Sequence, residues 1–553
     1  MASSSGKARI VEVVDEHEHS GSGSEVSEDE GRDHTLPETS APSTSSKKKK
    51  KKKSKAVKAL NALHGGGNEH VSDKLVSAVL EKVKETGQVP EPDLNAANVR
   101  AALEHMKIND VAQGKAGIGG INKKDMAGHK FWGTQPVPQA GDDAPTIDGP
   151  IEPSKSTSEV RQESYPLPNQ FEWGAVDVSD DAQLRELYEL LSGHYVEDDE
   201  AEFRFQYSAE FLRWALQPPG YHKDWHIGVR VASNKKLVAF IAAVPITLRV
   251  RENVLNSSEV NFLCVHKKLR SKRLTPVLIK EVTRRCNVKG IFQALYTAGL
   301  VLPTPVATCR YYHRCLNISK LVNVNFTHVP SNMTLARMIR LNKVAERPKL
   351  LAQGFREMED KDVPQVTNLY RRFQDRFGMS LEFSEEEVRH NFLSGKGVGP
   401  DGKDSWKRRR ENQVVWTYVI ENPNTHKITD FWSFYSLPST IMNSPAHNVL
   451  NAAYLYFYGT EVAFKPDAEK DGTLRKRLEE LVGDALIVAN EAKFDVFNAL
   501  TLMDNVEFLS DLRFGAGNGL LNFYIYNWRT SPLAGMNPLD GVPAGRGIGI
   551  PML

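Results

Sequence analysis

A pattern of strand, turn, strand, helix and strand occurs twice in this 553-residue chain, and the repetition limits the folds that the chain can adopt. The first copy begins with WHIGVRV and LVAFIAAVPITLRV (225–250), two apolar runs joined by a turn, as in an antiparallel hairpin. The second begins with VVWTYVIE and ITDFWSFYSLPSTI (414–441), and Pro438 lies 193 positions after Pro245. Because proline cannot donate a ladder hydrogen bond, Pro245 predicts a bulge or an open edge.

A helix and a further strand follow each hairpin. Residues 275–285 and 474–489 have helical spacing, and the strands IFQALY (291–296) and FDVFNAL (494–500) come next. Two similar α/β units in tandem explain this order economically, although ordinary strand and helix order without duplication would look the same. A further helix is expected ahead of the first copy from Leu184, Leu187, Leu190 and Leu191, with Ser179, Asp180 and Asp181 as capping candidates.

Residues 1–128 are rich in Ser, Glu, Lys and Gly, and we expect this extension to be disordered because it can bury little apolar surface. A modest helical pattern at 71–83 is the exception. The lysine run at 47–53 fits a solvated tail or nuclear-import patch, and equally a tether to a polyanion such as ribosomal RNA. Both interpretations stay open, and ribosome contact is the partner interaction that follows from the second. Since 71 basic and 69 acidic residues nearly cancel, any such attraction must be local.

The rest of the chain is long enough for two units with their own cores, which we place at 129–342 and 343–553. The cysteines show no CxxC spacing, so we expect a reducing compartment, no disulfides and no metal; they are Cys264, Cys286, Cys309 and Cys315. The opening MASSSGKARI contains no apolar segment, and 18 uninterrupted apolar residues occur nowhere. We therefore expect a cytoplasmic monomer without a membrane span.

The sequence EVNFLCVHKKLRSKRLTP (259–276) sets an apolar strand, a basic loop and a helix start in succession. Free backbone N–H groups and the positive end of a helix dipole would point into this loop, which is a phosphate-binding arrangement. If the strand is splayed, the amides of Phe262 and Leu263 can hold a carbonyl oxygen that becomes negative during acyl transfer. Taken alone, a basic loop is more often a solvated surface. Its basic residues are Lys267, Lys268, Arg270, Lys272 and Arg273.

The chain finishes with IGIPML, ending at Leu553. A free α-carboxylate folded back beside the basic loop would be a base that no side-chain motif reveals. Chain ends usually fray, but an apolar ending has reason to dock. We therefore expect the Leu553 carboxylate to lie near the strand that follows Glu259.

Several segments together resemble the N-myristoyltransferases (glycylpeptide N-tetradecanoyltransferases), and their style is that of fungal members. EVNFLCVHKKLRSKR is similar to a signature of that family. The other similar segments, in the family's order, are HKFWGTQPVP (129–138), YVEDDE (195–200), YTAG (296–299), CRYYHR (309–314), YSLPSTIMN (435–443), DVFNAL (495–500) and RFGAGNGLLNFYIYNW (513–528). The resemblance covers about 129–553.

The resemblance implies transfer of a tetradecanoyl group from myristoyl-CoA, without a metal, to the α-amine of an N-terminal glycine in peptides and nascent proteins. It implies an α/β fold of two acetyltransferase-like (GNAT) units related by a pseudo-twofold axis, with mixed sheets flanked by helices. The family's oxyanion hole matches the amides of Phe262 and Leu263, and its catalytic base matches the α-carboxylate of Leu553.

Binding residues are implied in the same way. For acyl-CoA the matching positions are His129, Lys130, Phe131, Trp132, Leu263, Cys264, Val265, Ser271, Lys272, Arg273, Leu274 and Thr275. For the peptide they are Tyr195, Asp198, Asp199, Phe203, Phe205, Thr297, Tyr311, His313, Phe326, Tyr435, Ser439, Asn518 and Leu521.

The chain departs from the family's second signature at two positions, with Arg513 before FG and Asn518 between two glycines, where a lysine and an aspartate are usual. The second change removes a carboxylate that would face a cationic substrate group. Two alternatives remain beside the main interpretation. One is an acetyltransferase that uses a short acyl-CoA, and the other is a noncatalytic ribosome-bound adaptor that acts through the lysine run.

Overall fold

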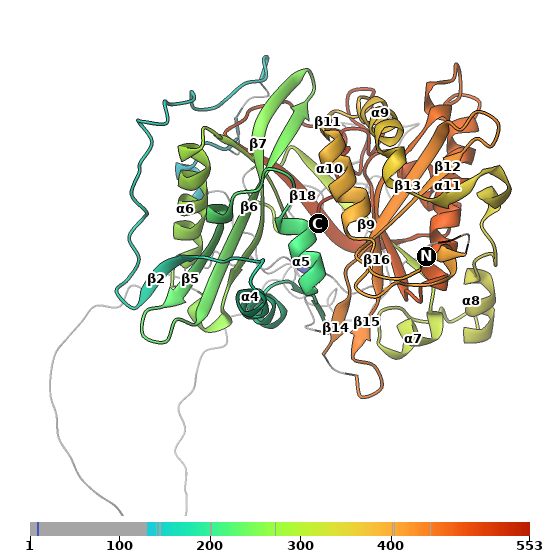
Figure 1. Ribbon diagram of the computed structural model, residues 1–553, viewed down its shortest axis with the longest axis horizontal. Coiled ribbons are helices and arrows are strands. Elements are labelled where there is room, and N and C mark those ends of the chain that lie inside the picture. Colours follow the sequence, from blue (N-terminus) through green and yellow to red (C-terminus); the bar gives the residue numbers. More distant parts are fainter. Residues whose placement is uncertain are drawn as a thin grey trace, which may run out of the picture. The chain divides into compact units, whose positions relative to one another are not determined.

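The computed structural model describes residues 8–9 and 130–553, apart from 140, 143–144, 199–201, 271, 303, 401, 403 and 443. The described residues belong to one structural unit, which is drawn in colour in Figure 1. Apart from residues 8–9, the expected disorder of 1–128 falls outside the described residues, as do the helical pattern at 71–83 and the lysine run at 47–53.

A sheet of 13 strands runs through the described part of the chain, in the order β10-β12-β13-β16-β17-β9-β18-β8-β7-β6-β5-β2, with β11 added to β6. The strands that come first in sequence are β2 (Phe171–Ala175), β5 (His226–Val231), β6 (Leu237–Val250), β7 (Asn253–Val265), β8 (Gln293–Ala298) and β9 (Ala307–Cys315). Those that follow are β10 (Phe355–Glu357), β11 (Met379–Leu381), β12 (Val415–Glu421), β13 (Ile428–Ser436), β16 (Ala452–Thr460), β17 (Val496–Leu500) and β18 (Gly515–Tyr526).

The expected repetition is present in the topology. In the first half β5, β6 and β7 pair antiparallel, and helix α6 (Leu274–Val288) then leads to β8, which pairs parallel to β7. In the second half β12, β13 and β16 pair antiparallel, and helix α11 (Thr473–Glu491) leads to β17, which pairs parallel to β16. The mixed α/β class and the two similar units are therefore confirmed.

Two strands cross between these halves. Strand β9, which follows the first half in sequence, pairs with β17 of the second half. Strand β18, near the end of the chain, pairs with β8 of the first half and with β9. The sheet therefore continues from one half to the other at its centre, and the expected division at residues 342 and 343 stays a prediction about the sequence.

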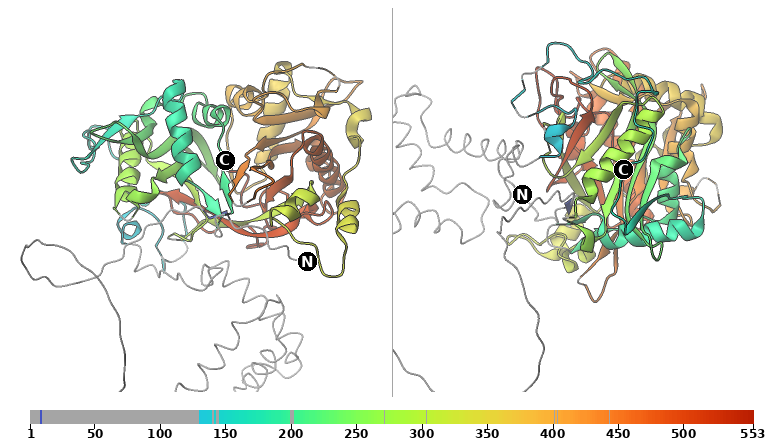
Figure 2. Two further views of the ribbon diagram at one scale, coloured as in Figure 1. Left: turned by 90° about the horizontal axis from the view of Figure 1, so that it is seen from below. Right: turned by 90° about the vertical axis from the view of Figure 1, so that its left-hand side faces the viewer.

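Helices cover both faces of the first half (Figures 1 and 2). Phe240 and Ala242 of β6 share a core with helix α4 (Asp181–His194), whereas Ala239 and Ile241, which point the other way, share a core with α6. A strand buried on both faces explains the continuous apolar run in LVAFIAAV. The side chain of Asp180 caps α4 by accepting a hydrogen bond from the Gln183 amide at 2.9 Å, as the sequence predicted.

The two prolines at the repeat differ in their effect. Pro245 stays inside β6, beyond the last residue that pairs with β5 and before the segment that pairs with β11, so the predicted open edge is confirmed. Pro438 ends the expected long strand instead, because β13 stops at Ser436. The chain then enters a smaller sheet of order β1-β3-β4-β14-β15. Its strands are β1 (Ala8–Arg9), β3 (Glu197–Asp198), β4 (Phe203–Phe205), β14 (Ser439–Ile441) and β15 (Val449–Leu450).

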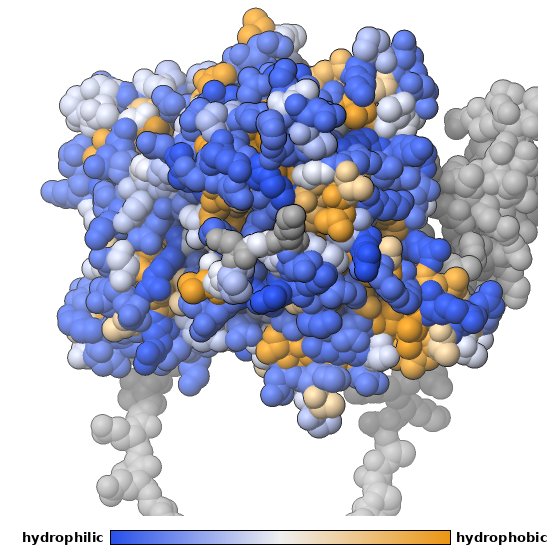
Figure 3. All heavy atoms as spheres, turned by 45° about the vertical axis from the view of Figure 1, so that its right-hand side comes forward, coloured by the Kyte–Doolittle hydropathy of each residue, from blue (hydrophilic) through white to orange (hydrophobic). Residues whose placement is uncertain are grey.

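The other helices are shorter. They are α5 (Ala209–Leu216), α7 (Ile318–Asn323), α8 (Leu335–Asn342), α9 (Val363–Gln374), α10 (Glu385–Arg389) and α12 (Val506–Leu509). The face shown in Figure 3 is largely hydrophilic, with apolar residues gathered in a few patches. Within the described residues, no helix combines the length and apolar character needed to cross a bilayer.

Candidate active site

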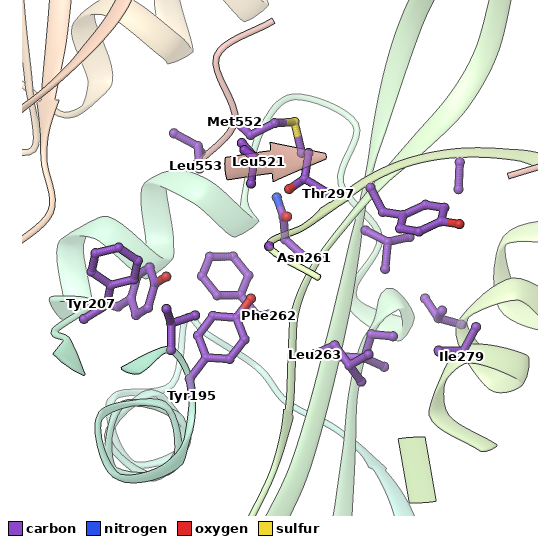
Figure 4. Close-up of a pocket in the computed structure, with 18 of the residues that line it drawn as sticks. Tyr195, Tyr207, Asn261, Phe262, Leu263, Ile279, Thr297, Leu521, Met552 and Leu553 are labelled. Carbon is purple, nitrogen blue, oxygen red and sulfur yellow. The ribbon is translucent and has the colours of Figure 1, made fainter. Parts of the chain in front are cut away.

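A cavity lies where β7, β8 and β18 meet the last residues of the chain (Figure 4). The space between its walls, including open solvent at the mouth, is about 1150 Å³. Its lining includes Asn261, Phe262, Leu263, Thr297, Leu521, Met552 and Leu553. Strand β7, strand β18 and the last residues of the chain therefore meet at this cavity. The sequence had singled out all three segments.

Strand β7 carries a bulge at this cavity. The pairing with β6 shifts between Asn261 and Cys264, so that Phe262 and Leu263 stand opposite a single residue. Phe262 has φ of 58°, in the left-handed region that bulky residues rarely adopt. A bulge disrupts the ladder locally and turns backbone groups away from the partner strand. The splayed strand expected from the sequence is present where the cavity lies.

Aromatic packing holds the bulge in place. The ring of Phe262 lies 5.3 Å from that of Tyr207, edge to face, and 6.1 Å from that of Tyr195. Phe262 is 2% exposed. Burial raises the pKa of Tyr207 well above its usual value, so this hydroxyl stays neutral. Tightly packed neighbours of this kind can maintain a strained backbone conformation.

The end of the chain is docked at the cavity wall. Met552 is 7% exposed, and Leu553 is partly buried in the lining. The hydroxyl of Tyr435 donates a hydrogen bond to the Met552 carbonyl at 3.0 Å, and the Gly549 amide donates to the Met379 carbonyl at 2.7 Å. These contacts hold the last residues of the chain in the cavity wall.

The opposite part of the cavity is apolar. Helix α6 contributes Ile279 and Val282, and β6 contributes Ile241. Trp132 stacks on Tyr296 with ring centres 5.5 Å apart, and both rings belong to the lining. These side chains all belong to the core on the α6 side of the sheet or pack against it.

The basic loop leads into α6, the helix whose residues Ile279 and Val282 line the cavity. Its first residues form a short 3₁₀ turn (Lys267–Leu269), and Arg273 precedes α6 with φ of 58° and no side-chain cap. The first amides of this 15-residue helix are therefore available to an anion. Lys268, Lys272 and Arg273 are exposed. Strand, loop and helix start have the arrangement that the sequence predicted for phosphate binding.

The basic loop is tied to the acidic segment beside it. Lys267 and Arg204 both form ion pairs with Glu197, the latter at 2.9 Å. Burial opposes ionisation of Glu197, but these two cations outweigh it and lower its pKa. The Arg270 guanidinium donates to the His194 carbonyl at 2.6 Å. The Asp198 side chain and Asp199 lie outside the described residues.

A second cavity adjoins the first and shares Phe205 and Tyr311 with it. His313 lies in its wall, with Nδ1 2.7 Å from Oδ1 of Asn498, and burial lowers the pKa of this histidine. A Cβ at Gly517 would lie 2.4 Å from Nε2 of His313, so a larger residue would displace the ring. Asn518 follows this glycine, and Gly519 belongs to the lining. The cavity also contains Phe203, Phe326 and Ser439.

The remaining predicted residues lie elsewhere. Phe131, Cys264, Val265 and Leu274 are core residues with exposures of 8%, 2%, 8% and 4%, so their side chains are packed inside the protein. Lys130 is exposed at the start of the main described segment, and Thr275 lies in the first turn of α6. His129 and Ser271 lie outside the described residues. The acyl-CoA assignments of these residues stay predictions.

Sequence reasoning missed Asn261, Tyr207, Tyr296 and Tyr454, which all line the first cavity. The signal for Asn261 was present in the motif EVNFLC, since Glu and Asn interrupt an otherwise apolar strand. The tyrosines gave no comparable signal, because aromatic residues are common in strands. Among the described residues no group of three or more His, Cys, Asp or Glu side chains is arranged to hold a metal ion.

A bulged strand, a largely apolar cavity and a basic loop before a helix are compatible with an acyltransferase. Comparisons with known proteins agree. Residues 150–309 match the family Myristoyl-CoA:protein N-myristoyltransferase, N-terminal domain, and residues 323–550 match its C-terminal domain. The chain belongs to the N-myristoyltransferase family of acyltransferases.

Relatives and solved structures give the same result. The chain is 48% identical to a glycylpeptide N-tetradecanoyltransferase of Aspergillus fumigatus, over 82% of this chain and 89% of that protein. It is 44% identical to that of Mycosarcoma maydis, over 84% and 75% respectively. A crystal structure of Saccharomyces cerevisiae N-myristoyltransferase with bound myristoyl-CoA is 46% identical, with a TM-score of 0.72, and the match covers 78% of this chain and all of that one.

Proposed function

We propose that the protein transfers a myristoyl group from myristoyl-CoA to the α-amine of an N-terminal glycine. The observation that carries this proposal is the meeting of the β7 bulge and the Leu553 terminus in one cavity. The names of the relatives and the bound molecule in the yeast structure support the choice of substrates.

Two surfaces of the protein bind different parts of the acyl-CoA. The hydrocarbon chain lies against Ile241, Ile279 and Val282, where each buried CH₂ contributes about 0.8 kcal/mol. The phosphates lie at the basic loop and the start of α6, where positive charge and free amides coincide. Short-chain acetyl transfer would leave most of this apolar wall without a ligand, so the long acyl group fits better.

The terminal carboxylate of Leu553 acts as the general base. A peptide ammonium has an ordinary pKa of about 7.7–8.0, so a positioned carboxylate is sufficient to remove its proton. The nitrogen lone pair then attacks the thioester carbonyl carbon. As the amide C–N bond is completed the C–S bond breaks, and CoA leaves as a thiolate that takes up a proton.

The amides of Phe262 and Leu263 stabilise the oxygen that becomes negative during this attack. Their place in a bulge frees them from the β6 ladder, which supports their assignment as an oxyanion hole. Loss of one such donor typically lowers the rate about 10²–10³-fold.

The glycine end of the peptide enters the first cavity, and its downstream residues occupy the second. Tyr311, His313 and Ser439 line the second cavity and would contact the peptide. Asn518 beside it offers a hydrogen bond rather than a charge. Ribosome contact through residues 47–53, a monomeric state and a cytoplasmic location remain predictions from the sequence.

Altering the chain end tests the base. Deleting Leu553 or adding one glycine after it displaces the carboxylate, so single-turnover acyl transfer should fall about 10²–10⁴-fold. Leu553→Ala is the matched control, because it trims the side chain and keeps the carboxylate at the same backbone position. Release of free CoA with a Gly-starting peptide measures each rate. A full rate in the extended or deleted chain would remove the base assignment, and absence of CoA release by the wild type would remove the proposed function.

A further inference from the structure

Helix α8 lies on the surface of the protein, and none of its eight residues is buried. Leu335 is 39% exposed, Ile339 is 42% exposed and Leu341 is 39% exposed. Helices of this length are marginal on their own in water, and most helices in proteins are stabilised by packing of an apolar face. Packing against the core therefore does not account for the large apolar residues of α8.

The protein nevertheless holds α8 in place at its C-terminal end. The guanidinium of Arg314 on β9, which is 4% exposed, donates hydrogen bonds to the carbonyl of Asn342 at 2.9 Å and to its Oδ1 at 3.0 Å. Burial lowers the pKa of Arg314 to about 10, because a guanidinium is charged and the interior is poorly solvated. This anchor gives α8 a defined position although its apolar residues are exposed.

The segment that contains α8 carries a local excess of positive charge. Between positions 335 and 349 the sequence has five basic residues and a single acidic one, Glu346, whereas the whole chain has a net charge of only +2. The five basic residues are all exposed, and they are Arg337, Arg340, Lys343, Arg347 and Lys349.

A basic turn from another part of the chain lies beside this segment. The ion pair with Lys407 lowers the pKa of Asp404, and Arg408 and Arg347 lower it further. Lys407 and Arg408 are exposed. The positive surface therefore extends from α8 to this turn.

Apolar and basic residues lie on different sides of α8. At 3.6 residues per turn, Leu335 and Ile339 are neighbours along one side of the helix, whereas Arg337 and Arg340 point away from that side. Helix α8 lies at the right of Figure 1, which is the side that comes forward in Figure 3, and a patch of apolar residues is visible at the lower right of that view. An apolar side next to basic residues is typical of helices that lie in the interface of a bilayer.

Possible partners of this surface differ in what they complement. The phosphates of a nucleic acid would pair with the basic residues but would leave Leu335 and Ile339 in water. A second copy of this chain would bring the same positive surface against itself, which costs electrostatic free energy. A lipid surface with anionic headgroups complements both the charge and the apolar side chains.

We propose that α8 docks on an anionic lipid surface, with Leu335 and Ile339 inserted at the boundary between headgroups and acyl chains. The exposed cations of residues 335–349 then lie beside the anionic headgroups. The docking is independent of the proposed transfer reaction, because no residue of α8 lines either cavity.

Co-sedimentation of the full chain with vesicles tests the charge requirement. The vesicles contain about one part phosphatidylserine to two parts phosphatidylcholine, and vesicles of phosphatidylcholine alone should bind the wild type at least about tenfold more weakly. Each basic residue near an anionic surface strengthens binding about fivefold, so Arg337→Gln/Arg340→Gln should weaken it about twentyfold. The lysine run at 47–53 is the same in every variant, so differences between variants report on α8.

A second pair of substitutions tests insertion of the apolar side chains. Leu335→Ser/Ile339→Ser should weaken binding to the phosphatidylserine vesicles about tenfold. At about 0.5 M salt, where electrostatic attraction is screened, the wild type should keep some binding and this variant should lose it. The matched control is Val254→Ser/Val542→Ser, which also changes two exposed apolar residues, 59% and 42% exposed, but ones with an acidic residue two positions before each. The control should stay within about twofold of the wild type.

Three results would overturn the proposal. The first is vesicle binding that neither pair of α8 substitutions weakens. The second is tight binding of an RNA duplex that the arginine pair weakens, while the serine pair leaves vesicle binding unchanged. The third is a dimer of the wild type, seen by sedimentation velocity, that the serine pair converts to a monomer. The Tm of each variant should stay within about 2 °C of the wild type, because no substituted residue of α8 is buried. If the serine pair does not fold, Ile339→Ser alone takes its place.

Discussion

His226 illustrates how one buried side chain sets a pH limit on the fold. It is 1% exposed at the start of β5, and its Nε2 lies 3.0 Å from the Leu216 carbonyl. Burial lowers the pKa of His226 to about 4. Hydrogen bonds with the backbone of Leu216 and Val176 favour the charged form but do not outweigh burial. A histidine with a lowered folded-state pKa is held neutral by the fold, so its contribution to stability is complete above its ordinary pKa of about 6.5 and is lost as the pH falls toward 4.

This residue predicts a measurable loss of stability in mild acid. Between pH 7 and pH 5 the His226 contribution to the free energy of unfolding should fall by about 2 kcal/mol. His226→Asn removes the titrating group, so the difference between the wild type and this variant should shrink by that amount over the same range. Urea unfolding at the two pH values measures it. A difference that does not change with pH would show that His226 is not held neutral.

Single residues also show the limits of the sequence. The carboxyl group of Glu259 and the amide of Asn261 could have been singled out as polar residues in an apolar strand, but their mutual hydrogen bond depends on side-chain geometry. Phe262 and Leu263 were found by motif and by resemblance. The left-handed φ of Phe262 has no local signal, because glycine and not phenylalanine marks such positions.

At the scale of an element, the final segment of the chain is anchored several residues before its end. Nε of Arg546 lies 2.8 Å from Oδ1 of Asp504, whose side chain is fully buried, and the Met503 amide donates to the Ile548 carbonyl at 2.8 Å. Arg376 donates to the other oxygen of Asp504 at 2.6 Å. These contacts set the path by which Leu553 reaches the cavity.

Because of this anchor, we expect substitutions at Arg546 and Arg376 to affect the rate of acyl transfer differently while costing similar stability. Arg546→Met releases the final segment, so the rate of single-turnover acyl transfer should fall more than tenfold. Because Arg376 still pairs with Asp504, the free energy of unfolding should fall by only about 1–3 kcal/mol. Arg376→Met is the matched control: it removes the same kind of ion pair from Asp504 but does not belong to the final segment. It should cost similar stability and much less rate. Equal rate losses in both variants would argue against positioning through the anchor.

Local elements were largely predictable because each has a periodic or capping signal. The helices α4, α6 and α11 and the hairpin of β5 and β6 follow from apolar spacing, proline position and turn residues. The end of β13 before Pro438 was predicted wrongly, because one apolar run there serves two different sheets. Tertiary pairing, and not local preference, decides such a boundary.

At the scale of the whole molecule, sequence patterns could not show how distant strands pair. The repeated units were visible, but the exchange of β9 and β18 was not, because pairing between distant strands leaves no periodic mark on either one. This exchange places Thr297 on β8 beside Leu521 on β18, and so brings the two repeats together at the site. The cavity depends on the exchange.

The exchange predicts that neither half folds alone. Fragments 130–342 and 343–553, expressed separately, should be insoluble or lack cooperative unfolding, because β8 and β17 each lose a partner strand. Expressed together with an affinity tag on one fragment, they should purify as a pair. A soluble fragment with a sharp thermal transition of its own would contradict this expectation, and the intact chain serves as the reference.

The order of strands in the sheet also bears on how the chain is made. Synthesis proceeds from the N-terminus, so β8 is complete long before β18, which begins at Gly515, has been translated. During that interval the hydrogen-bonding edge of β8 that β18 will occupy is open, and an open edge in a growing polypeptide invites association with other chains. The central sheet of this enzyme is therefore completed only after the last part of the chain has been translated.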